Sequence, residues 1–253
     1  MGYTHAEFVV MFMALFVILV LGVILRFTLK NKPLAIRQIP LHILGATIVI
    51  IEIVKQIYRI AEGTWTTRCL PFHFCSFFLI WYGLALITRG KFRQLMYFCS
   101  LIGGITVTVF MYCAPRIILV DAAHTFWDSF SHFHAFFFHM SVVAYWVWML
   151  MLNIYQPDYQ HIKKAVMLYT AFYFVTIAGA FIFKENYADV LYPSLKVFDQ
   201  FRLTAGQFAY DVALLAVGIG LITGMSYAAY FITSKLYRHN LKQNQKHALQ
   251  VQN

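Results

Sequence analysis

The sequence predicts an all-α membrane protein, built as a bundle of seven transmembrane helices. Of its 253 residues, 61% are hydrophobic and only 12% are charged, whereas a soluble domain carries about a quarter charged residues. A bilayer core of about 30 Å is crossed by roughly 20 apolar residues of helix. Apolar runs of that length recur along the chain, and they are too long and continuous for barrel strands of about 10 residues. The expected spans are 8–29, 39–60, 70–88, 94–113, 130–153, 163–183 and 207–233.

The distribution of basic residues predicts the orientation of this bundle. Lysines and arginines gather in the first, third and fifth gaps between the spans, and again after the last span. Under the positive-inside rule these segments are cytoplasmic, so the N-terminus is outside and the C-terminus is cytoplasmic. Orientation in the bilayer thereby explains the net charge of +10, and no nucleic-acid partner is expected. Two parts follow: a transmembrane domain over 1–233 and a basic cytoplasmic tail over 234–253.

The longest expected outer connection, 184–206, is rich in apolar side chains such as Tyr187, Tyr192 and Phe198. A free loop in water would not carry so many of them. The composition is typical of an interfacial segment held by aromatic side chains. The segment could instead fold as a lid over an outward-facing cavity.

Four polar side chains lie in the second expected span: Glu52, Lys55, Gln56 and Arg59. Each ionisable group at membrane depth costs roughly 2.5–3.5 kcal/mol, so such groups usually face a cavity or one another. Glu52 and Lys55 have the i,i+3 spacing of a helical ion pair, which would offset much of that cost. The pair could hold helices together or face a substrate. The planar guanidinium of Arg59, nearer the outer end, matches a lipid phosphate.

The third expected span opens with RCLPFHFCS, in which Pro71 suits a first helical turn. On a regular helix Arg68, Cys75 and Tyr82 form one stripe, while His73 lies nearly opposite Cys75. A single cysteine in a membrane helix is usually a packing residue. A nucleophilic role requires a base or a positive neighbour that favours the thiolate.

Candidate bases lie in the fifth expected span, where Asp128, His132 and His139 share one helical face and His134 points elsewhere. An aspartate that orients a histidine beside a cysteine is the arrangement of a catalytic triad. Three histidines could instead bind a metal, but two of them lack a common face and no HExxH motif is present, so no metal or other cofactor is expected. No lysine lies within 207–233, which excludes a retinal Schiff base on the last helix.

Four elements together carry a family resemblance: Glu52 with Lys55, LPFHFCS over 70–76, FFFHMS over 136–141, and Asn186 with Tyr187. In this order, across most of the chain, they resemble the bacterial YwaF-type integral membrane proteins, which have no established reaction. More distant animal relatives are membrane acyltransferases that move a fatty acyl chain onto an ether lysophospholipid. The resemblance implies a multi-pass protein of the bacterial cell (plasma) membrane. It also implies that the cysteine and the histidine of those acyltransferases correspond to Cys75 and His139.

The sequence therefore predicts a lipid acyltransferase or acyl hydrolase of the outer leaflet, with a membrane lipid as substrate. Cys75 would attack an ester carbonyl, His139 or His132 would take the proton, and Asp128 would orient the base. Expected substrate-binding residues are Arg59, Arg68, His73, Glu52, Lys55, His134, Tyr82, Asn186, Tyr187 and Asp211. The alternative is an ion or solute transporter, or a membrane sensor, that uses Glu52 and Lys55. A structural membrane role, the oligomeric state and a Cys69–Cys113 disulfide are left open at this point.

Overall fold

The computed structural model describes residues 4–113, 119, 125–193 and 196–252, and for residues 196 and 239–252 it describes the backbone alone. All regular structure in these residues is helical, so the all-α prediction is confirmed for them. The α-helices are α1 (His5–Leu29), α2 (Leu34–Arg37), α3 (Ile39–Ala61), α4 (Phe77–Ile87), α5 (Gly90–Cys113), α7 (Phe130–Met151), α8 (Gln160–Phe183), α9 (Lys196–Ala205) and α10 (Gln207–Gln252). Short 3-10 turns are η1 (Thr67–Cys69), η2 (Phe74–Ser76) and η3 (Tyr187–Asp189).

The chain is a multi-pass membrane protein. Among the described residues, 6 helical segments are long and apolar enough to cross a bilayer. They are α1, the continuous α2–α3 segment Leu34–Ala61, α5, α7, α8 and the Gln207–Arg238 part of α10. Each one overlaps an expected span. α10 also runs without a break into the expected tail, 234–253, whose side chains after Arg238 lie outside the described residues.

The remaining expected span, 70–88, is not a continuous transmembrane helix. α4 has 11 residues, and together with η2 it forms an apolar segment over Phe74–Ile87. At 1.5 Å per residue that segment measures about 20 Å, which is less than a bilayer core. The sequence prediction of a full-length third span is wrong, and residues 62–76 instead form a connector between α3 and α4.

Pro71 explains this break in the helix. The residue before a proline is pushed towards extended conformations, and Leu70 has φ −65° and ψ 148°. The sequence suggested that Pro71 stands in the first turn of the helix. It instead lies after η1 and before α4. Arg68 and Cys75 lie on separate 3-10 turns. The predicted stripe through Arg68, Cys75 and Tyr82 does not exist.

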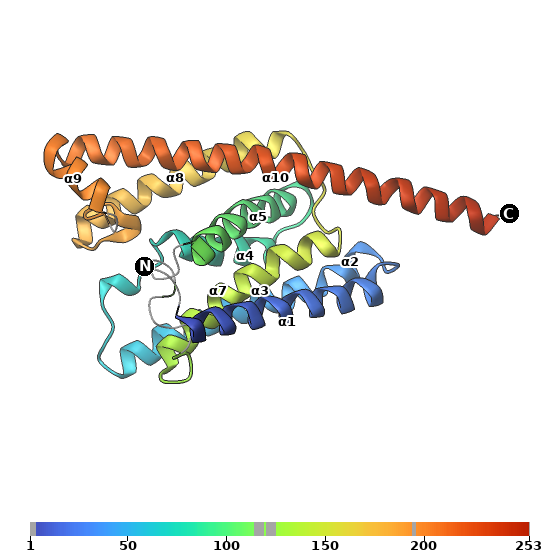
Figure 1. Cartoon of the computed structure of the whole chain (residues 1–253), viewed down its shortest axis with the longest axis horizontal. Coiled ribbons are helices and arrows are strands. Elements are labelled where there is room, and N and C mark those ends of the chain that lie inside the picture. The colour runs from blue at the N-terminus through green and yellow to red at the C-terminus, as the bar shows by residue number, and fades with distance from the viewer. Residues whose placement is uncertain (1–3, 114–118, 120–124, 194–195, 253) are drawn as a thin grey trace.

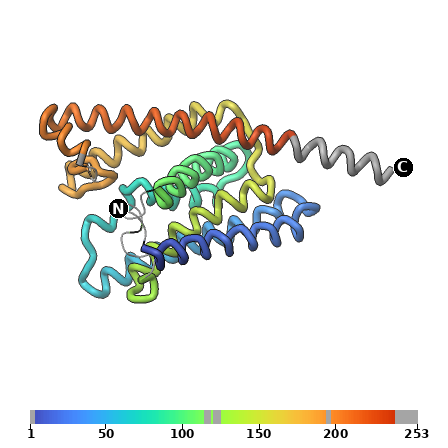
Figure 2. Tube along the Cα trace, in the orientation of Figure 1, coloured from blue at the N-terminus to red at the C-terminus, as the bar shows by residue number. Residues whose placement is uncertain are grey.

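The helices form three tiers, as Figure 1 shows: α8 with α10, then α4 with α5, then α1 with α3 and α7. α5 is the central helix. In its most apolar stretch 72% of the residues are buried, whereas the share is only 17–22% in the corresponding stretches of α1, α2–α3, α8 and α10. The connector 62–76, the turn before α7 and α9 all lie at one end of the bundle, which we call the connector end (Figures 1 and 2). The opposite end, the turn end, carries α2 and residues 152–159.

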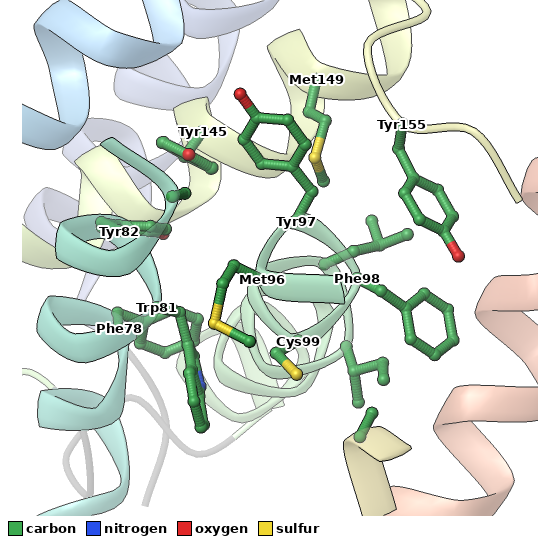
Figure 3. Close-up of a cluster of buried hydrophobic side chains, with 14 of the residues drawn as sticks. Phe78, Trp81, Tyr82, Met96, Tyr97, Phe98, Cys99, Tyr145, Met149 and Tyr155 are labelled. Carbon is green, nitrogen blue, oxygen red and sulfur yellow. The ribbon is translucent and has the colours of Figure 1, made fainter. Parts of the chain in front are cut away.

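Aromatic side chains from α4, α5 and α7 fill the centre of the bundle (Figure 3). Tyr82 stacks on Tyr145 with ring centroids 4.0 Å apart, and both side chains are buried. Trp81 packs edge-on against Tyr169 of α8 at 5.5 Å. Offset and edge-to-face ring pairs of this kind add to the free energy of apolar burial. They hold α4 in the bundle although it is too short to cross a membrane.

α1 packs closely on α7 because Gly22 has no side chain. A Cβ atom at Gly22 would lie 2.5 Å from Sδ of Met151 and 3.0 Å from the Trp148 ring. The close approach also lets Nε1 of Trp148 donate to the Ile18 carbonyl at 3.0 Å. Gly22 thus determines where α1 packs on α7.

Two arginines stabilise the C-terminal end of α7. A helix leaves its last carbonyl groups without backbone partners, and cations near them also interact favourably with the helix dipole. Nη1 of Arg26 donates to the Met151 carbonyl at 2.8 Å. Nη1 of Arg37 donates to the Leu152 and Asn153 carbonyls at 2.8 and 3.3 Å. Basic residues that the sequence assigned only to orientation therefore also hold α1 and α2 against α7.

Candidate active site

A polar cluster joins α3 to α7 near the connector end, around the Glu52 carboxylate. Nζ of Lys55 lies 2.6 Å from Oε1, and Nε2 of Gln56 donates to the same oxygen at 2.7 Å. Nε2 of His134 lies 2.9 Å from Oε2, although the ring is not aligned for a full hydrogen bond. The predicted Glu52–Lys55 pair is present. His134 is the histidine that reaches it, with only 8% of its side chain exposed.

Gln56 ties this cluster to the connector 62–76. Its Nε2 also donates to the Cys69 carbonyl at 2.8 Å, and its Oε1 accepts from Nε1 of Trp65 at 2.9 Å. One side-chain amide thus fixes one edge of the connector on α3. The Cys69 carbonyl would otherwise need a different donor, because η1 ends at that residue.

The opposite edge of the connector is held by the segment after α8. Oγ1 of Thr67 donates to Oε1 of Glu185 at 3.1 Å, and the Tyr187 hydroxyl donates to the Thr67 carbonyl. The Tyr187 ring is fully buried and meets Phe72 and His73 edge-on at 5.2 and 5.3 Å. Residues 184–190 therefore cover the connector, and Tyr187 acts as a buried packing residue in this arrangement.

Cys75 lies on η2, at the point where the connector passes into α4. Its thiol is free, its side chain is half-buried, and it packs with Phe74 against the central core. The Lys55 ammonium and the Glu52 carboxylate are both within electrostatic range of the sulfur. Burial favours the neutral thiol of Cys75, and the Lys55 ammonium partly offsets this effect by favouring the thiolate.

His139 on α7 has the features of a general base. Its Nδ1 lies 2.6 Å from the Ala135 carbonyl one turn earlier, a bond that requires a proton on Nδ1. The lone pair is then on Nε2, which is buried and has no hydrogen-bond partner among the described residues. The ring is 6% exposed and lies within electrostatic range of His134 and Lys55. The free Nε2 lone pair can accept a hydrogen bond or a proton from a group that approaches it, while burial disfavours the charged imidazolium that would result.

Lys55 is the common neighbour of the two candidate catalytic groups. It acts electrostatically on both the Cys75 sulfur and the His139 ring. Within the described residues, Cys75 makes no side-chain hydrogen bond to an imidazole. Catalytic hydrogen bonds are often long or poorly aligned before substrate binds. Both groups therefore lie within electrostatic range of the Lys55 ammonium, whose side chain is 21% exposed, and no hydrogen bond joins them among the described residues.

The predicted Asp128–His132–His139 face is wrong for Asp128. α7 begins at Phe130, and Ser129 is its N-cap, whose side chain accepts from the His132 backbone N–H at 3.1 Å. Asp128 lies in the preceding turn and is exposed, so it is not on the helix. Nδ1 of His132 pairs with Oγ1 of Thr125 at 3.1 Å. The helix start therefore leaves Asp128 off α7, while His132 and His139 lie seven residues, about two turns, apart on it.

Two further predicted substrate-binding residues have polar partners, and a third is part of the hydrophobic core. The Asn186 side chain bonds the Leu191 and Tyr192 backbone N–H groups at 3.0 Å each, which shapes the turn after α8. Asp211 accepts from Nε2 of Gln207 at 2.9 Å within α10. Tyr82 is in the central aromatic core, and its buried hydroxyl has no partner among the described residues.

The two arginines of the predicted headgroup site differ in exposure. Arg59 is half-buried near the end of α3, and Arg68 is exposed on η1. No acidic side chain of the described residues pairs with either one. Both are therefore available at the connector end for an anionic group.

His73 differs from the other histidines in its surroundings. It lies in the connector, before η2. Burial lowers the pKa of His73, and the nearby Arg68 guanidinium lowers it further. Since its ordinary pKa is about 6.5, His73 is neutral at pH 7. It therefore contributes packing and a neutral ring to the connector rather than a charge.

The described residues contain no group of three or more His, Cys, Asp or Glu side chains that could hold a metal ion. All four cysteines are free thiols, so Cys69 and Cys113 are not bridged in this structure.

A comparison with protein-family models matches residues 1–230 to the TMEM164 family. The chain belongs to the TMEM164 family. No curated protein and no solved structure shows a significant similarity to it. The matched region of this TMEM164-family chain contains the Glu52 cluster, the connector, Cys75 and His139. The matched region ends at residue 230, within α10.

Proposed function

We propose that this TMEM164-family protein transfers a fatty acyl chain between membrane lipids, or releases it to water, through a thioester on Cys75. The observation that carries the proposal is the unpartnered, buried Nε2 of His139. Its tautomer is fixed by the Ala135 carbonyl, and it shares the neighbour Lys55 with Cys75. The substrate class comes from the resemblance of LPFHFCS to the YwaF-type proteins, whose more distant animal relatives are membrane acyltransferases.

The proposed reaction has two half-reactions at one ester carbonyl. In the first, His139 takes the thiol proton, the Cys75 sulfur attacks the carbonyl carbon, and the carbon–oxygen ester bond breaks. The departing alkoxide receives the proton from His139 and leaves as a lysolipid. In the second, His139 takes a proton from the acceptor hydroxyl or from water, which attacks the thioester. The carbon–sulfur bond breaks, and the thiol regains its proton.

The polar cluster has a distinct role in this mechanism. The Lys55 ammonium would stabilise the thiolate, and Glu52 with His134 would hold that ammonium at membrane depth. Arg59 and Arg68 at the connector end would bind a lipid phosphate, for which a guanidinium is well shaped. We further propose that the connector end faces the outer side of a bacterial cell membrane, so that the substrate comes from the outer leaflet.

Acyl transfer between defined lipids tests the proposal. The full-length protein is reconstituted in vesicles of phosphatidylcholine with a deuterated sn-2 acyl chain and an ether lysophospholipid acceptor, and products are measured by mass spectrometry. Cys75→Ala should abolish both transfer and release of the labelled chain. Cys69→Ser, in the same connector, changes only a side chain outside the proposed site and should keep at least half of the activity. Full activity in Cys75→Ala would end this mechanism.

A second function, ion or solute transport, is favoured by the Glu52–His134–Lys55 cluster, since ionisable groups at membrane depth often mark a pathway. In this alternative, the carboxylate would bind and release a cation or a proton. Flux into vesicles that survives Cys75→Ala and disappears in Glu52→Gln would support transport. Loss of acyl transfer in Cys75→Ala, with no flux in the unmodified protein, would support the enzyme.

A further inference from the structure

An open hollow of about 710 Å³ lies at the turn end of the bundle, away from Cys75 and His139. Its walls are the start of the α2–α3 segment, the turn between α4 and α5, and residues 156–161 before and within α8. The volume is in the range of small-molecule sites, about 300–1,000 Å³. None of the residues proposed for acyl transfer lines it.

Three cations line this hollow: Arg89, Lys91 and Arg93. Arg93 is held in place, because its Nε donates to the Thr88 carbonyl at 2.6 Å and its Nη1 to Oε1 of Gln38 at 3.3 Å. The remaining donors of its guanidinium stay available. Arg89 and Lys91 are exposed and make no ion pair with any described residue.

Asp158 is the one acidic side chain in the lining, and it does not neutralise these cations. Its Oδ1 accepts from the Gln160 backbone N–H at 2.9 Å, and its Oδ2 lies 4.0 Å from Nε2 of His161. Asp158 therefore caps the start of α8. The hollow keeps a positive excess, and α5 adds to it because its N-terminus, at Gly90, carries the positive end of the helix dipole.

We propose that this hollow binds the phosphate group of a phosphorylated ligand. Two arginines and a lysine around one space suit a phosphate dianion, because guanidinium groups bind phosphate oxygens with paired N–H donors. Basic residues that only orient a membrane protein need no particular arrangement within a loop. Arg89, Lys91 and Arg93 instead line one hollow together. The phosphate could belong to a lipid headgroup in the adjacent leaflet or to a soluble phosphate ester, and both present the same group to the three cations.

Native mass spectrometry of the full-length protein in detergent tests the site with two probes, short-chain phosphatidic acid and inorganic pyrophosphate. We expect one saturable site for at least one probe. Arg89→Gln with Lys91→Gln should weaken its affinity at least tenfold. Lys163→Gln with Lys164→Gln removes the same charge from exposed residues of α8 outside the hollow and should change affinity less than twofold.

A variant that binds the probe more tightly provides a second test, because misfolding would weaken binding and could not strengthen it. Asp158→Asn removes the lining acid but keeps an acceptor for the Gln160 N–H, so it should bind the probe at least twofold more tightly. Binding of phosphatidic acid alone assigns the site to a lipid headgroup, and displacement of that lipid by pyrophosphate assigns it to soluble phosphate esters. Saturable binding of neither probe, or equal losses in the two double variants, overturns the proposal.

Discussion

Replacement of Gln56 by leucine should loosen the connector that carries Cys75. The side-chain amide makes two bonds to the connector, to the Cys69 carbonyl at 2.8 Å and from Trp65 at 2.9 Å. A net hydrogen bond between neutral groups contributes about 0.5–1.5 kcal/mol, and an unmade buried one costs more. Trp65 is 40% exposed, so its N–H can bond water instead. The connector should therefore lose about 1–2 kcal/mol, which increases its opening 5–30-fold.

Hydrogen exchange in lipid nanodiscs measures this opening directly. Peptides that cover 62–76 should exchange 5–30-fold faster in Gln56→Leu, while peptides at the turn end stay unchanged. Gln94→Leu is the matched control, because Gln94 bonds the Ile154 carbonyl and the Gln156 N–H at the turn end. It should accelerate exchange there and leave 62–76 unaffected. Unchanged exchange over 62–76 in Gln56→Leu would refute the role given to this residue.

Two other predictions concern stability. Arg37→Gln removes the guanidinium that caps the Leu152 carbonyl at 2.8 Å and should destabilise the protein by about 1–3 kcal/mol, seen as a lower Tm; an unchanged Tm would contradict this capping role. Gly104→Ala should also lower Tm, because its Cβ would lie 2.7 Å from the Trp146 ring and crowding of a packed interface costs about 1–3 kcal/mol. Gly220→Ala, where a Cβ meets open space, is the control and should leave Tm unchanged or raise it.

Composition and hydropathy were sufficient to predict the helical class and the positions of the long spans. The third span failed for a local reason: hydropathy extends through RCLPFHF, but Pro71 holds Leu70 extended and ends η1. Apolar content alone does not distinguish a helix from an apolar connector.

The candidate site was predictable in its residue types but not in its partners. Glu52 with Lys55 followed from helical spacing. The Asp128 assignment failed because Ser129 is the N-cap and α7 begins only at Phe130, two residues after Asp128. A serine before an apolar run is a known helix-start signal. Glu185, which holds Thr67, was missed. Only the fold brings these two together, since they are 118 positions apart.

The central claim is that Cys75 and His139 act on one substrate carbonyl. The most direct measurement is the rate at which a labelled acyl chain appears on the Cys75 peptide, as a hydroxylamine-sensitive mass increase. His139→Gln should slow this step at least ~100-fold, the usual contribution of a general base, while His132→Gln should change it less than threefold. An acyl adduct that forms equally fast in His139→Gln, or that never forms on Cys75, would contradict the claim.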